Sequence, residues 1–300
     1  RVRIPAGVVR SGDNRRLKGE DLARGSAALR AGRLIRPADL GLLASLGQAE
    51  VAVFRRLRVA FFSTGDELRS IGEPLDAGCV YDSNRYTVWG MLQRLGVQAI
   101  DLGVVRDDPA ALREAFSQAA ACADAVITSG GVSVGEADHT KRIMAELGEV
   151  LFWRIAMRPG RPMAIGRIGT PPGAEGRTGS AARQAILFGL PGNPVAVMIT
   201  FYAFVRDALL RMAGTTPQPL PLLRAASVAT IRKKPGRTEY QRGIVSRGGD
   251  GRWQVRITGS QGSGILRSMS QANGIVVLHH DQGNVAAGEA VDVLPFDGLV

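Results

Sequence analysis

The chain has 300 residues, 45 % of them hydrophobic and 22 % charged, a composition that supports a large core and is ordinary for globular proteins. Its net charge of +11 lies on two flanks, because residues 1–57 hold 12 Lys or Arg against 5 Asp or Glu, residues 58–214 hold 16 against 16, and residues 215–300 hold 10 against 6. No apolar run approaches about 18 residues, no secretory leader opens the sequence and no nucleic-acid motif occurs. We therefore expect no membrane span, no signal peptide and no nucleic-acid partner. The basic flanks indicate either a solvated surface or a site for an anionic ligand.

Residues 1–57 are rich in Arg and Gly, and their apolar stretches are short, as in "LGLLASLG". They predict no closed domain of their own. The sequence also begins at Arg1 without an initiator Met. We therefore expect the chain to be part of a longer protein, with this segment as the last part of something larger.

Residues 58–214 alternate between apolar strands and capped helices. Strands are expected at 58–63, 97–105 and 124–129 and around 150–156, 162–168 and 185–190, and helices at 82–96, 107–121, 138–148 and 193–214. Asp82 or Ser83, Asp108 and Asn193 are placed to cap helices. The alternation predicts a doubly wound, mostly parallel sheet. Residues 169–184, rich in Gly, Pro, Ser and Arg, are expected to form a flexible surface insertion.

Residues 215–300 form a second pattern after the proline-rich linker "GTTPQPLP". Helical periodicity stops, and short strand-like runs are separated by Gly, Asp and Asn. The runs are "RAASVATI", "EYQRGIV", "WQVRIT", "GIVVLHH" and "AVDVLPF". They predict a small all-β domain.

The glycine-rich stretch "SGGVSVGEAD" follows the strand at 124–129. Gly130, Gly131 and Gly135 allow the backbone to approach a ligand, and their N–H groups can cradle phosphate oxygens. Ser129 and Ser133 add hydroxyl donors, and the helix that starts nearby adds positive dipole. The alternative is a tight turn with an N-cap.

Spare carboxylates follow three of the predicted strands. Glu67 comes after Thr64 and Gly65, Asp107 precedes the capping Asp108, and a third carboxylate, Asp138, closes the glycine-rich stretch. Carboxyl ends of strands in an open α/β sheet form the ligand site. Carboxylates would repel a phosphate unless a divalent cation such as Mg²⁺ lay between them. The three carboxylates therefore predict one site for a cation and an anionic ligand.

Two stiff loops offer further anion contacts. "MRPGRP" places Arg158 and Arg161 on a Pro-Gly turn, where guanidinium groups bind oxyanions in a bidentate manner. "LPGNP" places Pro191, Gly192, Asn193 and Pro194 at a helix N-terminus. Each loop alone is equally compatible with an exposed turn, and His139 is better explained as a solvated residue than as a base.

Six stretches of this chain together resemble the MoeA-type molybdopterin molybdenumtransferases, the family that includes the E domains of gephyrin and plant Cnx1. In chain order they are "STGDEL", "YDSNR", "GVVRDDP", "SGGVSVGEADHTK", "FWRIAMRPGRP" and "LPGNPVA". "GEDL" and "ASLG" resemble the last parts of the two N-terminal domains, and "GRTEYQRG" and "SQGSG" the C-terminal domain. The resemblance covers nearly the whole chain.

The resemblance implies insertion of molybdate into adenylylated molybdopterin, with release of AMP, formation of molybdenum cofactor and a requirement for Mg²⁺ or a similar cation. It implies a homodimer whose active site lies between the central domain of one subunit and an N-terminal domain of the other. It also implies acidic site residues at Asp21, Glu67, Asp107 and Asp138, basic anion contacts at Arg154 and Arg158, a proline loop at Pro191 and Pro194, and functional positions at Arg242 and Ser263.

Two departures from the family pattern stand out. Arg154, Arg158 and Arg161 occupy positions where many members carry Lys, so the geometry at the oxyanion differs. Most of the family's N-terminal half is also missing from the sequence.

Two other functions share parts of the pattern. A MogA-type molybdopterin adenylyltransferase has the same central fold and a glycine-rich, Asp-bearing loop, but it lacks the β domain and the N-terminal pieces; a protein of that type is also a candidate partner. A gephyrin-like scaffold is the non-enzymatic alternative, although the complete acidic set favours retained chemistry. Cys79 and Cys122 lie outside any metal-ligand spacing, which indicates a reducing, cytoplasmic setting.

Overall fold

The computed structural model describes residues 2–132, 138–169 and 184–296. The chain divides into two units, Arg1–Val53 and Phe54–Val300. The smaller unit contains one helix, α1 (Pro37–Ser45), which the sequence did not predict. Its start is fixed locally, because Pro37 opens it and the buried Asp39 accepts the Arg36 N–H and both arms of Arg33, at 2.7 and 3.0 Å.

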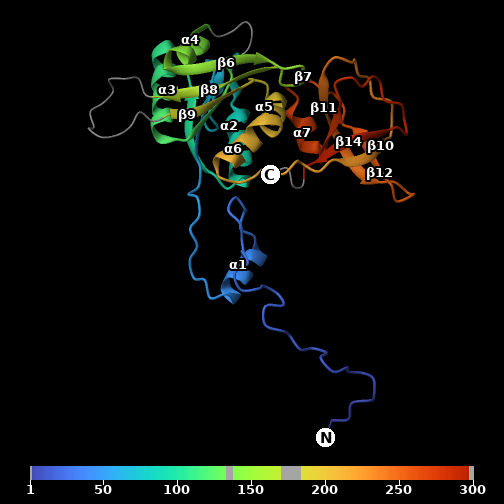
Figure 1. Ribbon diagram of the computed structural model, residues 1–300. Helices are drawn as coiled ribbons and strands as arrows, with labels where there is room; N and C mark the ends of the chain where they lie inside the picture. The colour runs from blue at the N-terminus through green and yellow to red at the C-terminus, as the bar shows by residue number, and fades with distance from the viewer. Residues whose placement is uncertain (1, 133–137, 170–183, 297–300) are drawn as a thin grey trace, which may run out of the picture. The chain divides into compact units, whose positions relative to one another are not determined.

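A six-stranded sheet forms the centre of the larger unit (Figure 1). In spatial order its strands are β4 (Gln98–Val105), β1 (Arg58–Thr64), β5 (Ala125–Ser129), β9 (Gln184–Leu190), β8 (Pro162–Gly169) and β6 (Gly148–Arg154). The β4–β1, β1–β5 and β5–β9 pairs are parallel, whereas β8 is antiparallel to both of its neighbours. Only β8 therefore runs against the others, and the expected mostly parallel α/β sheet is confirmed.

Helices cover both faces of this sheet. Successive residues of β1 point to opposite faces, so Phe61 packs into one core and Phe62 into the other. On the Phe62 face lie α3 (Pro109–Cys122), which contributes Phe116, and α4 (Asp138–Leu147). On the Phe61 face lie α2 (Ser83–Arg94) and the helix that follows β9.

The helix after β9 is not uniform, although the sequence predicted a single α-helix over 193–214. It consists of α5 (Pro194–Thr200), one π-helical segment, η1 (Phe201–Val205), and α6 (Arg206–Met212). The backbone stays helical through both junctions. A π turn is wider than an α turn, and here it keeps Phe201 and Val205 fully buried together against the sheet.

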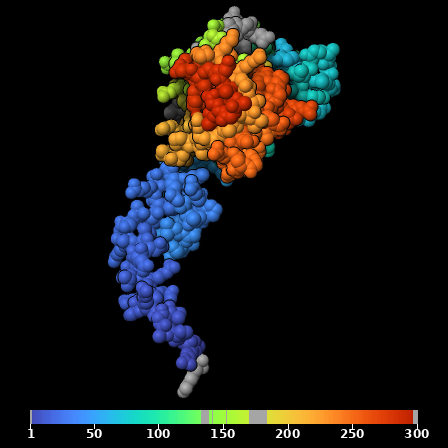
Figure 2. All heavy atoms as spheres, turned by 90° about the vertical axis from the view of Figure 1, so that its right-hand side faces the viewer, coloured from blue at the N-terminus to red at the C-terminus, as the bar shows by residue number. Residues whose placement is uncertain are grey.

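The predicted small β domain closes into a barrel. Its strands are β10 (Leu223–Ser227), β11 (Thr238–Arg247), β12 (Trp253–Ile257), β13 (Gly274–Leu278) and β14 (Ala290–Pro295). β12 pairs with β10 and with β11, so the sheet returns on itself around a core that includes Val255, Leu278 and Val293. This domain, coloured orange to red, lies toward the viewer in Figure 2.

Three short elements were not predicted. β2 (Leu68–Arg69) and β3 (Val80–Tyr81) pair with each other, and α7 (Leu266–Gln271) lies between β12 and β13. β7 (Met157–Arg158) comes from the central domain in sequence but pairs in parallel with β11 of the β domain. The expected insertion at 169–184 falls almost entirely outside the described residues. Among the residues that the structure does describe, no helix is both long and apolar enough to cross a membrane.

Candidate active site

A pocket of about 280 Å³ lies at the carboxyl ends of the parallel strands. We call it the glycine pocket. It is lined by Thr64, Gly65, Asp66, Glu67, Leu68, Asn84, Asp107, Ser129, Gly130, Gly131 and Gly192. The loops after β1, β4, β5 and β9 all contribute to it, so the structure brings together residues that the sequence placed at four separate strand ends.

Main-chain hydrogen bonds fix these loops against one another. Gly65 N–H donates to Val105 O at 3.3 Å, and Gly130 N–H donates to Leu190 O at 3.1 Å. The buried hydroxyls of Ser63 and Ser129 lie 3.0 Å apart. Each loop is therefore held by its neighbour and not by a ligand, which leaves the pocket formed in advance.

Two glycines in the pocket admit no side chain. Gly130 has φ +94°, and a Cβ there would lie 2.7 Å from Thr64 O. Gly131 has φ +69°, and its Cβ would lie 2.6 Å from Thr140 Cγ2. Thr140 belongs to the first turn of α4, so the glycine turn abuts the N-terminus of that helix. The close approach supports a main-chain surface suited to an anion.

The carboxylates in and beside the pocket differ in whether they have hydrogen-bond partners. Asp108 caps α3 by accepting the N–H groups of Ala110 and Ala111, as the sequence predicted. Asp66 accepts the Asp107 N–H at 3.2 Å through its side chain. Asp107 Oδ1 is buried without a hydrogen-bond partner.

The donor set fits a hard cation held by few protein ligands. Glu67 and Asp107 both line the pocket, but no group of three His, Cys, Asp or Glu able to hold a metal occurs within 2–132, 138–169 and 184–296. Mg²⁺ typically takes one or two carboxylates and completes its shell with water and substrate phosphate. The unpartnered oxygen of Asp107 suits that arrangement. Asp138 opens α4, next to the glycine turn, and its side chain lies outside the described part.

The predicted arginines do not gather in this pocket. Arg158 lies in β7 and lines a larger cleft of about 690 Å³ on the β domain. Arg154 ends β6 and Arg161 precedes β8, both exposed, and neither lines either pocket. His139 is exposed, with its Nδ1 3.4 Å from the Arg142 side chain.

Arg242 is fully buried and supports a loop. Its guanidinium donates to the carbonyl oxygens of Ser260, Gln261 and Gly262 and to Ser268 Oγ, at 2.9 to 3.3 Å. Burial lowers the pKa of Arg242 to about 10, and repulsion from Arg158 acts in the same direction. Four of its five N–H donors are bonded to protein acceptors, so Arg242 holds the 260–262 loop in place.

That loop reaches the helix beside the glycine pocket. Ser263 O accepts the Val195 N–H at 3.0 Å, within the first turn of α5. Pro191 is buried and Pro194 opens α5, while Asn193 precedes the helix without making a side-chain cap. Thus Arg242 and Ser263 act on the Pro191–Pro194 loop through the main chain, a link that the sequence alone did not reveal.

Ser133 and Gly135 fall outside the described residues. Asp21 is exposed in the smaller unit.

Comparison with known families covers most of the chain. The family model described as "Probable molybdopterin binding domain" matches residues 60–211, that of the MoeA C-terminal region (domain IV) matches 224–296, and that of the MoeA N-terminal region (domain I and II) matches 1–47. A molybdopterin molybdenumtransferase of Haemophilus influenzae is 41 % identical over 96 % of the chain and 68 % of that protein. The chain belongs to the molybdopterin molybdenumtransferase family.

Further relatives agree with this membership. A molybdopterin molybdenumtransferase of Nostoc sp. is 36 % identical, and the chain covers 62 % of it. The solved molybdopterin biosynthesis MoeA protein of Pyrococcus horikoshii superposes with a TM-score of 0.75 at 29 % identity, over 93 % of this chain and 64 % of that one. A molybdenum cofactor biosynthesis protein of Pyrococcus furiosus gives 0.68 at 27 % identity, over 93 % and 82 %. The chain thus spans about two thirds of several family members.

Sequence reasoning missed two features of the site. Asn84, in the "DSNR" stretch, lines the glycine pocket and donates through Nδ2 to Gly192 O at 2.6 Å, which ties α2 to the loop after β9. Its signals in the sequence were its place just after a capping Asp and its position within the family-like stretch "YDSNR". The run of basic residues at 232–234 also went unnoticed, although it lines the larger cleft with Arg158.

Proposed function

We propose that this chain inserts molybdenum from molybdate into adenylylated molybdopterin and releases AMP, which forms molybdenum cofactor. In this reaction water cleaves the bond between the two phosphates that join AMP to molybdopterin, so that AMP leaves and the molybdopterin phosphate is restored. The two dithiolene sulfurs bond to molybdenum, and the molybdate oxygen that they displace leaves as water. Family membership supports the reaction class. The chain spans about two thirds of the length of its relatives, so the individual steps of the reaction and its substrates are our proposal for this chain.

The glycine pocket is the observation that carries the proposal. Glycine main chain, the hydroxyl of Ser129 and the start of α4 offer donors for phosphate oxygens. Glu67 and Asp107 stand at the same pocket with little to neutralise them. Phosphate and carboxylates in one small pocket are compatible when a cation separates them. We therefore place the phosphate groups that join AMP to molybdopterin here.

A bound Mg²⁺ or similar cation would neutralise charge on the phosphate oxygens as the AMP link breaks. Asp107 and Glu67 would hold it, and Asp138 at the start of α4 completes the acidic set by resemblance to the family. Gly131 would bind the phosphate through its main-chain N–H, since the Gly130 N–H already donates to Leu190 O. Asn84 would keep the loop after β9 in place.

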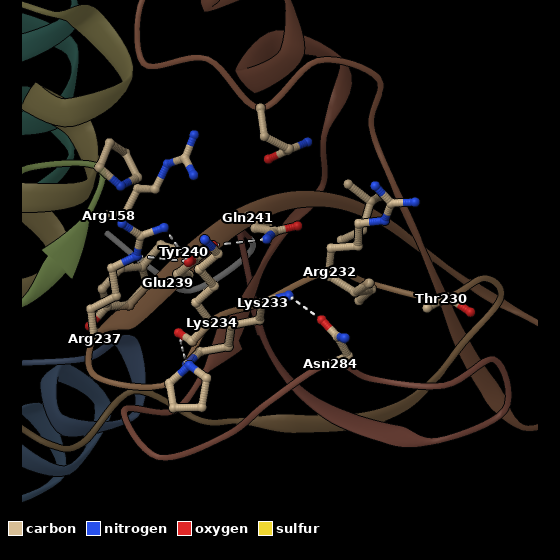
Figure 3. A pocket seen from close by; sticks show the side chains of 15 residues that line it. Arg158, Thr230, Arg232, Lys233, Lys234, Arg237, Glu239, Tyr240, Gln241 and Asn284 are labelled. Carbon is tan, nitrogen blue, oxygen red and sulfur yellow. Dashed lines mark hydrogen bonds and ion pairs between the residues drawn. The ribbon is translucent and has the colours of Figure 1, made fainter.

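Arg158 is the proposed contact for an oxyanion, either molybdate or the terminal phosphate. Its side chain is exposed and points away from the β7–β11 pairing into the larger cleft (Figure 3). Replacing Arg158 by Lys should weaken binding less than replacing it by Ala, because Lys keeps the charge and loses the fork. Calorimetric titration of molybdate and AMP into the three proteins tests this; equal affinities would remove Arg158 from the site.

Assembly belongs to the same proposal. We propose a homodimer in which an N-terminal domain, carrying Asp21, completes the partner subunit's site. A cytoplasmic setting and supply of adenylylated molybdopterin by a MogA-type adenylyltransferase follow from the same resemblance. Sedimentation of the full-length protein would reveal a monomer if the dimer is wrong.

The test of function compares two adjacent carboxylates in the full-length enzyme. Asp107→Asn should lower cation-dependent AMP release by at least about tenfold, because it removes a ligand of the cation. Asp108→Asn is the matched control, since Asn also caps helices and should leave release nearly unchanged. AMP release is measured with adenylylated molybdopterin, molybdate and Mg²⁺. Equal rates for both variants would overturn the cation role.

A further variant addresses the third carboxylate. Asp138→Ala should abolish cofactor formation while the protein unfolds near the wild-type temperature. Normal turnover in a stable variant would remove Asp138 from the site, and a large loss of stability would show that it only caps α4. Turnover of ATP with free molybdopterin, in place of the adenylylated form, would identify an adenylyltransferase, and no turnover at all would favour a scaffold.

A further inference from the structure

Residues 54–57 join the connector after α1 to the start of β1. We call them the anchor segment. The segment belongs to the larger unit, which begins at Phe54, and the proposed function assigns no role to it. Leu57 is the one side chain of the four that enters the core, at 6 % exposed. Phe54, Arg55 and Arg56 are exposed, so their hold on the larger unit comes from surface contacts.

Arg55 binds a carboxylate at the amino end of the central sheet. Its Nη1 and Nη2 donate to the two oxygens of Asp124, each at 2.7 Å, which is the forked geometry of the stronger ion pairs. The Asp124 side chain is only 16 % exposed. These hydrogen bonds raise the pKa of the Arg55 guanidinium. The pair is therefore better defined than an ordinary ion pair between two mobile side chains.

Asp124 is itself fixed by the strands on both sides of β5. Its N–H donates to Arg58 O at 2.8 Å, and its carbonyl accepts the Ile186 N–H at 3.0 Å. Its Oδ2 also accepts the Arg58 N–H at 2.8 Å. Because β1 and β9 hold the carboxylate in place, the fork restricts the backbone around Arg55 and not only its side chain.

Phe54 rests on the end of a helix. Gly214 follows α6 at φ +85° and donates its N–H to Arg211 O at 2.9 Å. The Thr215 N–H donates to Leu210 O at 2.9 Å, which completes the turn that commonly ends a helix at glycine. A Cβ on Gly214 would lie 2.7 Å from Cε2 of Phe54, so the ring occupies the space that another side chain would fill. The ring packs through one face, and 74 % of Phe54 stays exposed.

The anchor segment lies at the edge of the sheet opposite the glycine pocket. Asp124 directly precedes β5 and Arg58 opens β1, whereas the pocket is built from loops at the carboxyl ends of these strands. β1 has 7 residues. At about 3.3 Å per residue, the two edges are about 20 Å apart. The chain before Phe54 therefore leaves the larger unit about that far from the pocket of its own subunit.

We propose that Arg55 and Phe54 anchor the chain at this edge, so that the tether of the N-terminal unit is limited to residues 48–53. Those residues are exposed and have no regular structure. The proposal rests on the proposed function, in which the N-terminal unit brings Asp21 to the partner subunit's site. Arg55 is then a positioning residue for that site, although it contacts no substrate.

The expected size of the effect follows from the length of the tether. Release of residues 54–57 would lengthen it from 6 residues to 10, because the anchor segment also lacks regular structure. The effective concentration of a tethered group falls roughly as the −3/2 power of the tether's length, so the dilution is about twofold. Loss of a fixed direction of exit adds to this factor.

The first measurement follows the tether in the full-length protein. Every native cysteine is replaced by Ser, and a nitroxide label is attached through Ala52→Cys, two residues before Phe54. The double variant Phe54→Ala with Arg55→Met should narrow the lines of the label's EPR spectrum toward those of a free chain, because both contacts are lost. Arg56→Met is the matched control, since Arg56 is the exposed neighbour and its side chain is not part of the fork. Its spectrum should match that of the wild type.

The second measurement tests whether anchoring matters for the reaction. At saturating substrate, the unlabelled double variant should release AMP at least about twofold more slowly, with unchanged affinity of the glycine pocket for AMP. Arg55→Lys should give an intermediate rate, because Lys keeps the charge and loses the fork. Arg56→Met should release AMP at the wild-type rate. Unfolding temperatures verify that all variants fold.

A more mobile label together with slower release supports the proposal. An unchanged label in the double variant overturns the anchor, and a mobile label with normal release overturns the positioning role. An equal loss in Arg56→Met also overturns it, because the effect would then come from net charge. If the wild-type protein releases no AMP, the proposed function fails, and the label alone supports or overturns the anchor.

Discussion

The central α/β domain and the β domain hold their functional loops in opposite ways. In the α/β domain, main-chain groups and small side chains do so, as in the Gly130 N–H bond to Leu190 O. In the β domain, buried cations do so. Arg242 donates to three carbonyls of the 260–262 loop, and the Nζ of Lys233 donates to the carbonyls of Lys234, His280 and Gln282.

The difference determines where each region tolerates change. A pocket built from main chain has no room for an added Cβ, and the unpartnered Oδ1 of Asp107 stays free for a ligand. A loop held by a buried cation depends on that one side chain, while its exposed neighbours can vary. Four predictions test this contrast, two in each domain.

The largest effect is expected for Arg242→Met. The change leaves three carbonyls and Ser268 Oγ without their donor in a buried place, so the protein should lose about 3 kcal/mol or more of unfolding free energy. Chemical denaturation measures it. Arg256→Met, at an exposed position of β12, serves as control and should stay within about 0.5 kcal/mol of wild type. A small loss for Arg242→Met would mean that the loop is held by other contacts.

Gly130→Ala should follow. A Cβ at φ +94° and 2.7 Å from Thr64 O requires the turn to shift, at a cost of about 1–3 kcal/mol. AMP binding to the glycine pocket should fall with it. Gly236→Ala is the control, because Gly236 also has a positive φ but nothing within 4 Å of its Cβ. Equal loss of AMP binding in both variants would show that strain, and not the pocket, is responsible.

A smaller effect is expected at the cap of α3. Asp108→Ala removes the acceptor for the Ala110 and Ala111 N–H groups and should cost about 1 kcal/mol, while Asp108→Asn should cost a few tenths. Thermal unfolding of both proteins measures the difference. AMP affinity should be the same in both. A loss of affinity in Asp108→Asn would assign Asp108 to the ligand.

The smallest effect concerns Asp292 in the β domain. Hydrogen bonds from His279 at 2.6 Å and Arg224 at 2.9 Å lower the pKa of Asp292. A carboxyl whose pKa is lower in the folded state stabilises the protein above its unfolded pKa, about 3.9, and this contribution is lost as the pH falls through the folded pKa. Asp292→Asn should therefore cost less than about 1 kcal/mol at pH 6, and the difference should shrink as the pH falls below about 3.9. A pH-independent difference would exclude the ionic cause.

Local signals explain which parts of the fold the sequence could predict. Asp108 followed by Pro109 marks a helix start without reference to the rest of the chain, and α3 begins at Pro109. Phe61 and Phe62 lie in an apolar run typical of a strand with two covered faces, and β1 packs on both. The expected strand ends also located Glu67 and Asp107, because neighbouring parallel strands place their carboxyl ends at one edge.

Long-range pairing explains what the sequence did not predict. Nothing near Met157 indicates that it pairs with Thr238, which lies beyond the boundary between the two domains. Arg242 has the side chain expected of an anion contact, and only the fold reveals that carbonyl groups surround it. The Arg232 and Lys234 side chains stand out only once Arg158 lies at the same cleft. In each case the decisive neighbour is distant in sequence.

β7 has a consequence for how this protein can be divided. Its two residues belong to the α/β domain by sequence, yet they complete the edge of β11 in the barrel. A shortened chain that contains only the β domain would expose that edge, and an open edge pairs readily with another copy. The boundary between the two domains is therefore a property of the folded chain and does not correspond to any single point where the sequence could be cut.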